Sequence, residues 1–435
     1  MLDELRQAAL RQRTARSLRR LTQDSQHLLS DDAELGGMTV TGELIDRLDG
    51  LDDAQLDGYF DFLANDLSPD PTTVLRCAEA YAAAPGARTL MALTAAAEPP
   101  RQELLRRLNR GPGGTAAVLA LRRALLPKLK ARPELAALES DLQHLLGSWF
   151  NPGFLQMKRV DWQSPAQLLE RIIHHEAVHT IDGWDDLRRR LQPDRRCFAF
   201  FHPQLGDEPL IFVEVALLAE VPDAIAPLID KNSTPTREDR FRVAAFYSIS
   251  NCEPGLRGVS LGNFLIKTVA QQLQRELPQL KTFCTLSPIP GFARWFLSDP
   301  DLATLPPMRK GAMSELVQAR KLLLERCDGD LSALQSPAVH ERLQAPGADA
   351  LRLWCSAYLL ALSPTPAGDP VARFHLDNGA RLERINLRGN LSPHGLKQSF
   401  GVMVNYRYDL TQLEASHARF RKGEVTRSRA VGNAV

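Results

Sequence analysis

The sequence lacks three features that would place the chain in a specialised class. Its 53 Lys and Arg residues balance 52 Asp and Glu residues, and a formal net charge of +1 leaves no basic excess of the kind that nucleic-acid binding requires. Its six cysteines are spread over 435 residues with no C-x-x-C pair, which indicates small buried residues in a reducing compartment. No run of 18 apolar residues occurs, so we expect no membrane span. What is left is a globular protein long enough for two or three domains.

The first 190 residues have the pattern of helices. Apolar residues recur at intervals of three and four, with Ala, Leu and Arg dominating. The basic, amphipathic start would suit a transit peptide, but Asp3, Glu4 and the lack of an apolar core favour an ordinary first helix. The cluster Arg188–Arg190 is expected on a solvated helix face. We therefore predict an all-α N-terminal domain over residues 1–190.

From residue 191 the pattern changes to short β-rich runs separated by helices. Two apolar runs joined by a Pro/Gly/Asp turn at 203–209 predict a hairpin, and residues 300–362 return to helical patterning. The other expected elements are extended runs over 373–389 and 401–410 and a frayed basic tail from about 417. The predicted fold class is thus an α/β C-terminal domain over 191–435, with a helical insertion at about 300–362.

One stretch, HHEAVHTIDGW, contains the pattern H-E-x-x-H, formed by His175, Glu176 and His179. On a helix the two histidines would lie one turn apart and could ligate zinc. A catalytic zinc needs a third protein ligand, and the longer pattern H-E-x-x-H-x-x-G-x-x-H has Asp182 in place of its glycine and Asp185 in place of its last histidine. A zinc metalloprotease is therefore the less favoured alternative. Histidines near a helix end, interacting with its last carbonyls, are the favoured interpretation.

A second stretch has the order strand, glycine-bearing turn, helix, strand. The turn RGVSLG, from Arg257 to Gly262, stands at the entrance of the helix, where free backbone N–H groups can hold a pyrophosphate. Alone it is a weak signal, because two glycines at a helix start are often only a tight turn. The stretch resembles the pyrophosphate turn of the GCN5-related acetyltransferase fold, although Ser260 replaces its middle glycine. In that fold coenzyme A lies between two parallel strands that part, here residues 241–250 and 280–287.

Eight segments, in order along the chain, are similar to the malonyl-CoA decarboxylase family. They are YFDFLANDLSPDP, WFNPGFLQMKRVDWQSPAQLLERIIHHEAVH, WDDLRRRLQPDRRCFAFFHP, FYSIS, RGVSLGNFLIK, LSPIPGFARWF, VARFHLDNGA and GVMVNYRYDL. The resemblance implies a catalytic pair of Ser287 and His375, with Tyr408 as a supporting hydrogen-bond partner. The coenzyme-binding residues that it implies are Arg257, Gly258, Val259, Ser260, Leu261, Gly262 and Asn263. It also implies that EAVH has no metal role.

The implied reaction suits these residue types. Decarboxylation of malonyl-CoA leaves two electrons beside a thioester carbonyl, which accepts them as an enolate, so we expect no cofactor beyond the coenzyme A of the substrate. Ser287 can donate a hydrogen bond to the malonyl carboxylate or the oxyanion, and His375, with a pKa near neutrality, can protonate the enolate carbon. From the residues alone, Ser287 before proline is a turn residue and His375, in an alternating run, is a half-buried structural residue. Asn378-Gly379 predicts a hairpin turn.

Two other classes of function fit parts of the sequence. Members of the acetyltransferase fold more commonly transfer an acyl group from coenzyme A to an amine, which needs a general base and an acceptor groove. A helical interaction protein would use residues 1–190 as a partner-binding module, but the intact glycine turn, Ser287 and His375 count against a degenerate catalytic domain. The family resemblance implies homodimers or homotetramers formed through the helical domain. We expect a cytoplasmic, bacterial protein of fatty acid metabolism.

Overall fold

The protein divides into two compact units. The computed structural model describes residues 2–30, 37–259, 262–306 and 308–432. The helical unit comprises Met1–Gln156, Phe201–Glu208 and Glu253–Ser260, and the sheet unit comprises Met157–Phe200, Pro209–Cys252 and Leu261–Val435. The division after Gln156 differs from the border expected at residue 190, because residues 157–190 fold with the sheet.

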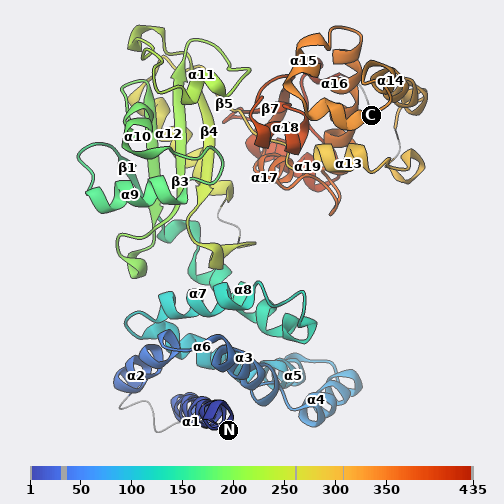
Figure 1. Ribbon diagram of the computed structural model, residues 1–435. Coiled ribbons are helices and arrows are strands. Elements are labelled where there is room, and N and C mark those ends of the chain that lie inside the picture. The colour runs from blue at the N-terminus through green and yellow to red at the C-terminus, as the bar shows by residue number, and fades with distance from the viewer. Residues whose placement is uncertain (1, 31–36, 260–261, 307, 433–435) are drawn as a thin grey trace. The chain divides into compact units, whose positions relative to one another are not determined.

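The helical unit is built from eight α-helices (Figure 1) among the residues that the structure describes. They are α1 (Leu2–Leu29), α2 (Gly37–Asp49), α3 (Asp53–Asp61), α4 (Pro71–Ala83), α5 (Ala87–Ala97), α6 (Pro100–Arg110), α7 (Gly114–Leu125) and α8 (Ala136–Trp149). Their three- and four-residue apolar spacing places one leucine-rich face of each of α6, α7 and α8 in the core. By contrast, α4 and α5 contain no buried residue.

The sheet unit is organised around a mixed seven-stranded sheet of order β1-β2-β3-β4-β5-β7-β6. Its strands are β1 (Gln156–Val160), β2 (Arg195–Phe201), β3 (Pro209–Leu218), β4 (Val243–Asn251), β5 (Thr282–Thr285), β6 (Arg381–Asn386) and β7 (Met403–Tyr408). Its helices are α9 (Ala166–His175), α10 (Gly183–Arg190), α11 (Ala226–Ile229), α12 (Gly262–Glu276), α13 (Phe292–Leu297), α14 (Ala312–Arg326), α15 (Pro337–Arg342), α16 (Gly347–Ala357), α17 (Pro370–Asp377), α18 (Pro393–Ser399) and α19 (Leu413–Arg421). The predicted hairpin is β2–β3, and the predicted order of a helical region followed by an α/β domain is confirmed.

The strands β4 and β5 form the parallel pair of the sheet, and helix α12 connects them. Their pairing runs from Val243 opposite Thr282 to Phe246 opposite Thr285. The amide of Leu286 still donates to the carbonyl of Phe246 at 3.0 Å, while β4 continues to Asn251. The strand pairing therefore stops after Phe246 and Thr285, as the resemblance implies, although β4 itself continues to Asn251.

The structure corrects the expected extended run over 373–389. Its first part is α17, which starts at Pro370 behind the N-cap Asp369, and only Arg381–Asn386 forms a strand. An N-cap aspartate followed by proline is a helix-start signal, and it went unused in the sequence prediction. Asn378-Gly379 joins a helix to a strand and is not a hairpin turn.

The tail differs from the prediction as well. Helix α19 extends to Arg421, and the segment after it pairs with β6 through a parallel bridge between Leu382 and Arg427. The amide of Leu382 donates to the carbonyl of Thr426 at 2.9 Å, and that of Ser428 donates to the carbonyl of Leu382 at 2.9 Å. The described tail is therefore held in place by the edge of the sheet rather than frayed.

In the described ranges, none of the helices combines the length and the apolar character that crossing a bilayer demands.

Candidate active site

Ser287 lies just beyond β5, where the parallel strands have parted. Its backbone forms two hydrogen bonds with Val404 of β7, from the Ser287 amide at 2.8 Å and to the Ser287 carbonyl at 2.9 Å. The side chain is 5% exposed, and its hydroxyl lies 2.9 Å from both Thr285 Oγ1 and His375 Nε2. The expectation from the residues alone, a turn serine that caps its own backbone, is therefore wrong.

His375 lies in the last turn of α17 and is buried. The start of that helix is tied to the segment after Ser287 by Asp369. One oxygen of the Asp369 carboxylate accepts from the amides of Val371 and Ala372, and the other accepts from the Gly291 amide at 3.0 Å. The sequence reasoning missed Asp369, and the dipeptide Asp-Pro at the helix start would have indicated it.

Four side chains form a hydrogen-bonded row through the imidazole. His375 Nδ1 lies 2.8 Å from the hydroxyl of Tyr408, and Nε2 lies 2.9 Å from Ser287 Oγ. When Ser287 donates to Thr285, Nε2 carries the ring proton and donates to Ser287, and Tyr408 donates to Nδ1. The ring of Tyr406 stacks on the imidazole with its centroid 4.7 Å away. The structure thus brings together the three residues that resemblance alone had indicated, and it adds Thr285 and Tyr406.

Burial controls the protonation of this row. Complete desolvation lowers the pKa of His375 to about 3, so the imidazole is neutral at pH 7 in the free protein. Burial also raises the pKa of Tyr408 well above its ordinary value. The expected histidine pKa near neutrality is therefore wrong for the free protein.

The Arg257 turn is anchored to the helical unit through its carbonyl groups. The buried Arg122 of α7 donates to the carbonyls of Gly255 at 2.5 Å and Arg257 at 2.7 Å, and it pairs with Glu139 at 2.6 Å. Gln143 of α8 donates to the carbonyl of Gly258, whose φ of +80° favours glycine. Side chains of α7 and α8 thus hold three backbone carbonyl groups in and just before the turn.

Some backbone amides of the turn donate hydrogen bonds to carbonyl groups just before them. Arg257 N donates to the Pro254 carbonyl at 3.1 Å, and Val259 N donates to the Leu256 carbonyl at 2.9 Å. Two predicted site residues, Ser260 and Leu261, lie outside the described residues. Gly262 and Asn263 open α12, and the first amides of a helix have no carbonyl partner within that helix.

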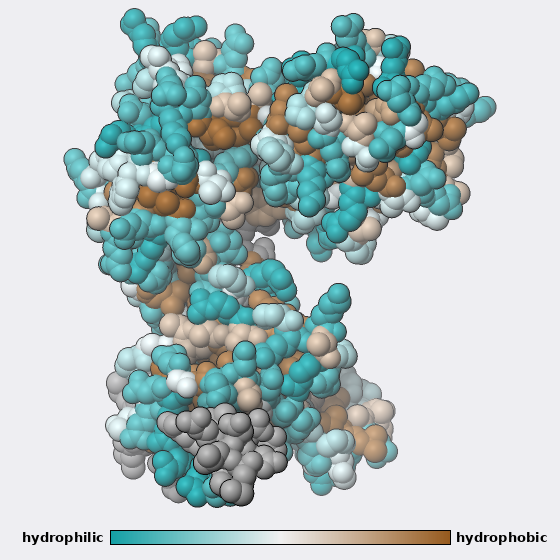
Figure 2. Space-filling model, viewed as in Figure 1, coloured by the Kyte–Doolittle hydropathy of each residue, from teal (hydrophilic) through white to brown (hydrophobic). Residues whose placement is uncertain are grey.

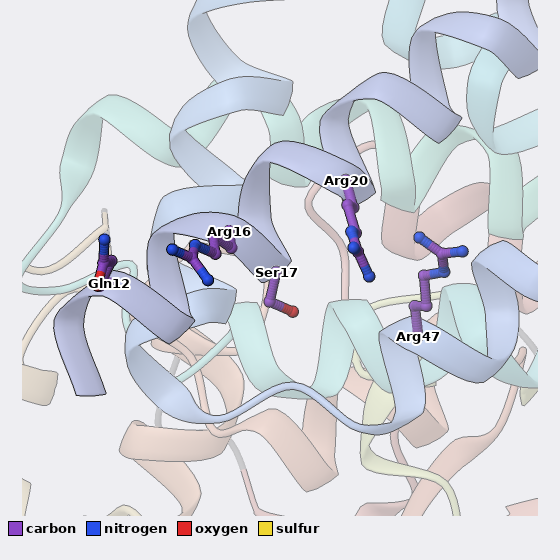
Figure 3. Close-up of a pocket in the computed structure, with 5 residues that line it drawn as sticks. All are labelled: Gln12, Arg16, Ser17, Arg20 and Arg47. Carbon is purple, nitrogen blue, oxygen red and sulfur yellow. The ribbon is translucent and has the colours of Figure 1, made fainter. Parts of the chain in front are cut away.

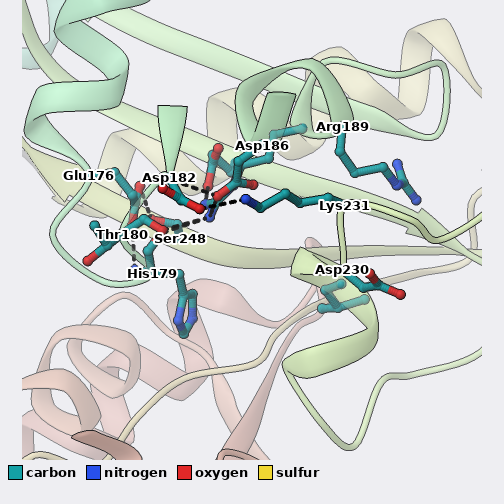
Figure 4. A network of polar contacts seen from close by, with 12 residues as sticks. Glu176, His179, Thr180, Asp182, Asp186, Arg189, Asp230, Lys231 and Ser248 are labelled. Carbon is teal, nitrogen blue, oxygen red and sulfur yellow. Dashed lines mark hydrogen bonds and ion pairs between the residues drawn. The ribbon is translucent and has the colours of Figure 1, made fainter. Parts of the chain in front are cut away.

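The H-E-x-x-H stretch does not have the helical geometry that the motif needs. Helix α9 ends at His175, and Glu176 is already extended at φ −67° and ψ 108°. The Glu176 carboxylate instead accepts from the amides of Val178 and His179 and from the hydroxyl of Ser248 (Figure 4). The search of the described residues finds no group of His, Cys, Asp and Glu side chains arranged for a metal ion.

A buried ion-pair network adjoins this stretch, since Arg190 also donates to the carbonyl of His179. Arg190, 1% exposed, donates to Asp186 and Glu214 at 2.9 Å each, and Arg189 pairs with Asp194 at 2.7 Å. The expectation that Arg188–Arg190 forms a solvated face is therefore correct only for Arg188. The two buried arginines need paired carboxylates because an unpaired buried charge is very costly.

A basic cavity in the helical unit is separate from all of these residues. Its volume is about 530 Å³, and it is lined by Gln12, Arg16, Ser17, Arg20 and Arg47 of α1 and α2 (Figure 3). Arg47 already pairs with Asp24 at 2.7 Å. No sequence-predicted site residue lines it.

The fold and the Ser287–His375–Tyr408 row define an α/β protein with a buried serine and histidine beside parted parallel strands. The chain matches the family model of the malonyl-CoA decarboxylase C-terminal domain over residues 153–435 and that of the N-terminal domain over residues 67–150. The chain belongs to the malonyl-CoA decarboxylase family.

Solved structures and curated relatives agree with this membership. The malonyl-CoA decarboxylase structure from Rhodopseudomonas palustris is 44% identical, covers 95% of this chain and 98% of its own, and has a TM-score of 0.82. That from Agrobacterium vitis is 42% identical over 95% of this chain and 99% of its own, with a TM-score of 0.80. The mitochondrial malonyl-CoA decarboxylase of Anser anser anser is 37% identical over 342 residues, 74% of this chain. The match spans 66% of that protein, just under two thirds of its length.

Proposed function

We propose that this protein converts malonyl-CoA to acetyl-CoA and carbon dioxide. The observation that carries the proposal is the row Ser287–His375–Tyr408, hydrogen-bonded on both sides of the imidazole, in a member of the malonyl-CoA decarboxylase family. The curated relative from Anser anser anser and the solved structure from Rhodopseudomonas palustris are both named malonyl-CoA decarboxylase.

The reaction needs an electron sink, an oriented carboxylate and one proton. The bond between the malonyl carboxylate carbon and the α carbon breaks, carbon dioxide leaves, and the electron pair moves into the thioester carbonyl to form an enolate. Since the substrate supplies this sink, we propose that no further cofactor takes part. Ser287 donates a hydrogen bond to the carboxylate or the enolate oxygen, and the α carbon then takes a proton from Nε2 of His375.

A neutral imidazole in the free protein fits this order of events. A malonyl carboxylate that enters beside His375 favours the imidazolium and raises its pKa, so the catalytic proton is gained together with the substrate. Tyr408 holds the ring at Nδ1 and keeps Nε2 directed toward Ser287. Substrate binding and protonation are thereby coupled in one step.

The coenzyme-binding part of the proposal rests on resemblance and on the turn. Arg257, Gly258, Val259, Ser260, Leu261, Gly262 and Asn263 are the proposed contacts. The start of α12 supplies amides for the pyrophosphate, and Arg257, which has an exposed side chain, supplies a guanidinium.

The test is incubation of the purified protein with malonyl-CoA alone. Release of carbon dioxide and formation of acetyl-CoA without an acceptor is the expected result. An acyltransferase, the chief alternative, would release coenzyme A only when an amine is added, and that outcome would replace the proposal.

Self-association through the helical unit is also proposed. Helices α4 and α5 pack on each other but leave large apolar side chains in solvent: Leu75 is 61% exposed, Leu90 46% and Met91 71%. Figure 2 shows hydrophobic residues on the surface over these helices. Light scattering should detect a dimer or tetramer that Met91→Glu dissociates, while Met313→Glu, at an exposed methionine of the sheet unit, leaves it intact.

A further inference from the structure

A small cavity lies where β6, β7 and α19 meet in the sheet unit. Its volume is about 200 Å³. The residues that matter for its chemistry are Arg381, Arg407, Asp409, Ser416, Arg419 and Thr426. None of the residues in the proposed reaction lines it, so the inference below is independent of that reaction.

Two arginines of this cavity are direct cross-strand neighbours. Arg381 of β6 stands opposite Arg407 of β7, and like charges in that position are destabilising. Glu383 is shared between them unequally, at 2.6 Å from Arg381 but 3.9 Å from Arg407. One carboxylate therefore offsets two guanidinium groups, and it makes its short contact with only one of them.

Helix α19 adds a third guanidinium to the same space. Gln412, Ala415, Ser416 and Arg419 all line the cavity, and their spacing of three, four and seven residues is that of one helix face. The Ser416 side chain is 8% exposed. The approach of helix and strand depends on Gly379, because a Cβ atom there would meet the Leu413 carbonyl oxygen at 2.2 Å.

The cavity also contains a hydroxyl that has nothing to bond within the described part of the chain. Thr426 Oγ1 is buried and makes no hydrogen bond there, although the Thr426 carbonyl is fixed by the amide of Leu382. The single acidic group, Asp409, already accepts from the amide and hydroxyl of Thr411 at 3.0 and 2.7 Å. These Thr411 bonds are the main reason that the Asp409 pKa is lowered, with Arg407 and Arg381 adding to the effect.

We propose that this cavity is a binding site for a phosphate group. Guanidinium groups from a sheet and a helix surround a space with a positive excess, and Thr426 and Ser416 supply neutral donors. A cavity of about 200 Å³ is smaller than the roughly 300–1,000 Å³ of sites that enclose drug-sized ligands. It therefore holds free phosphate or the terminal phosphate of a larger molecule.

The test is calorimetric titration of the full chain with inorganic phosphate in chloride buffer. Arg419→Gln should weaken binding about tenfold or more, because a charge-assisted contact is lost. Arg421→Gln is the matched control, since it removes the same charge from the same helix but lies outside the lining. Thr426→Val removes only the hydroxyl and should weaken binding about threefold or more, with circular dichroism as a check on folding.

The outcomes separate the possibilities. Phosphate bound at the Arg257 turn would be insensitive to Arg419→Gln and to Thr426→Val, and this result would overturn the assignment. Equal weakening by Arg421→Gln would reveal diffuse surface charge and would overturn it too. A parallel titration with adenosine 3′,5′-bisphosphate distinguishes the sources: binding tighter than that of inorganic phosphate, and lost in Arg419→Gln, assigns the site to a phosphate monoester. Equal or weaker binding assigns it to the free ion.

Discussion

Two histidines of the sheet unit are both buried but differ in their hydrogen-bond partners. Burial lowers the pKa of His375 to about 3, and burial together with the charge of Arg190 lowers that of His179 to about 4. His375 has a hydroxyl at each ring nitrogen. His179 bonds the backbone of Tyr247, while its Nε2 has no hydrogen-bond partner in the described residues. A lowered pKa is therefore common to both histidines and does not distinguish them, whereas hydrogen-bond partners at both ring nitrogens are found for His375 and support its proposed role.

Exchanging each histidine for asparagine should give the largest effect. His375→Asn should lower kcat by about 10²–10⁴, the range for loss of a general acid. His179→Asn, the matched substitution, should change kcat less than about tenfold, because no hydroxyl row depends on it. Steady-state decarboxylation assays measure both. Similar losses of kcat in the two variants would contradict the different roles assigned to the two histidines. A tightly bound zinc ion that is lost in His179→Asn would support the zinc metalloprotease alternative.

A serine that contacts His375 and a serine that contacts Glu176 of the H-E-x-x-H stretch should differ in the same direction. Ser287→Ala should lower kcat by about 10²–10³, as removal of one oxyanion donor does. Ser250→Ala is the control: its hydroxyl donates to Glu176 at 3.1 Å and has no contact with His375 among those described. Initial rates at saturating malonyl-CoA measure the two variants. A normal rate for Ser287→Ala would remove it from the reaction.

Patterns with a local physical cause could be predicted from the sequence. The parallel pairing of β4 and β5 and the helices of the first 150 residues follow from periodicity and from crossover rules, whereas the parting of the two strands was implied only by the resemblance. The sequence favoured a helix end at the H-E-x-x-H stretch, but the contacts that set this end could not be predicted: Glu176 accepts hydrogen bonds from Ser248 and Ser250, and α9 ends one residue before it.

The proposed catalytic row could not be predicted from the residues alone. Ser287 and His375 are 88 residues apart, and their meeting depends on the bridge from Ser287 to Val404 and on the Asp369 contact with Gly291. Only resemblance indicated the pair. Burial of the imidazole, which moves its pKa far from neutrality, needs the packed structure, because the alternating run around His375 predicted a strand where a helix lies.

Acid should destabilise the protein through His375 in a definite direction. Its folded pKa of about 3 lies below the ordinary value of 6.5, so the unfolded chain takes up a proton as the pH falls below about 6.5 and the folded chain does not. The stability that the neutral imidazole contributes is therefore lost as the pH falls from 6.5 toward 3. Between pH 6.5 and 5, wild type should lose about 1–2 kcal/mol more unfolding free energy than His375→Asn. Urea unfolding at the two pH values measures this difference, and parallel losses would contradict a neutral His375.

The two tyrosines around His375 provide the finest test. Tyr408→Phe removes the hydroxyl 2.8 Å from Nδ1 and should lower kcat about three- to tenfold at unchanged KM, the effect of one hydrogen bond that orients the ring. Tyr406→Phe should leave kcat unchanged, because the Tyr406 hydroxyl is buried without a partner in the described residues and only its ring stacks on the imidazole. Single-turnover rates separate the two. If Tyr406→Phe is slower than Tyr408→Phe, the Tyr406 hydroxyl contributes to the reaction. That result would contradict the role assigned to the Tyr408 hydroxyl at Nδ1 of His375.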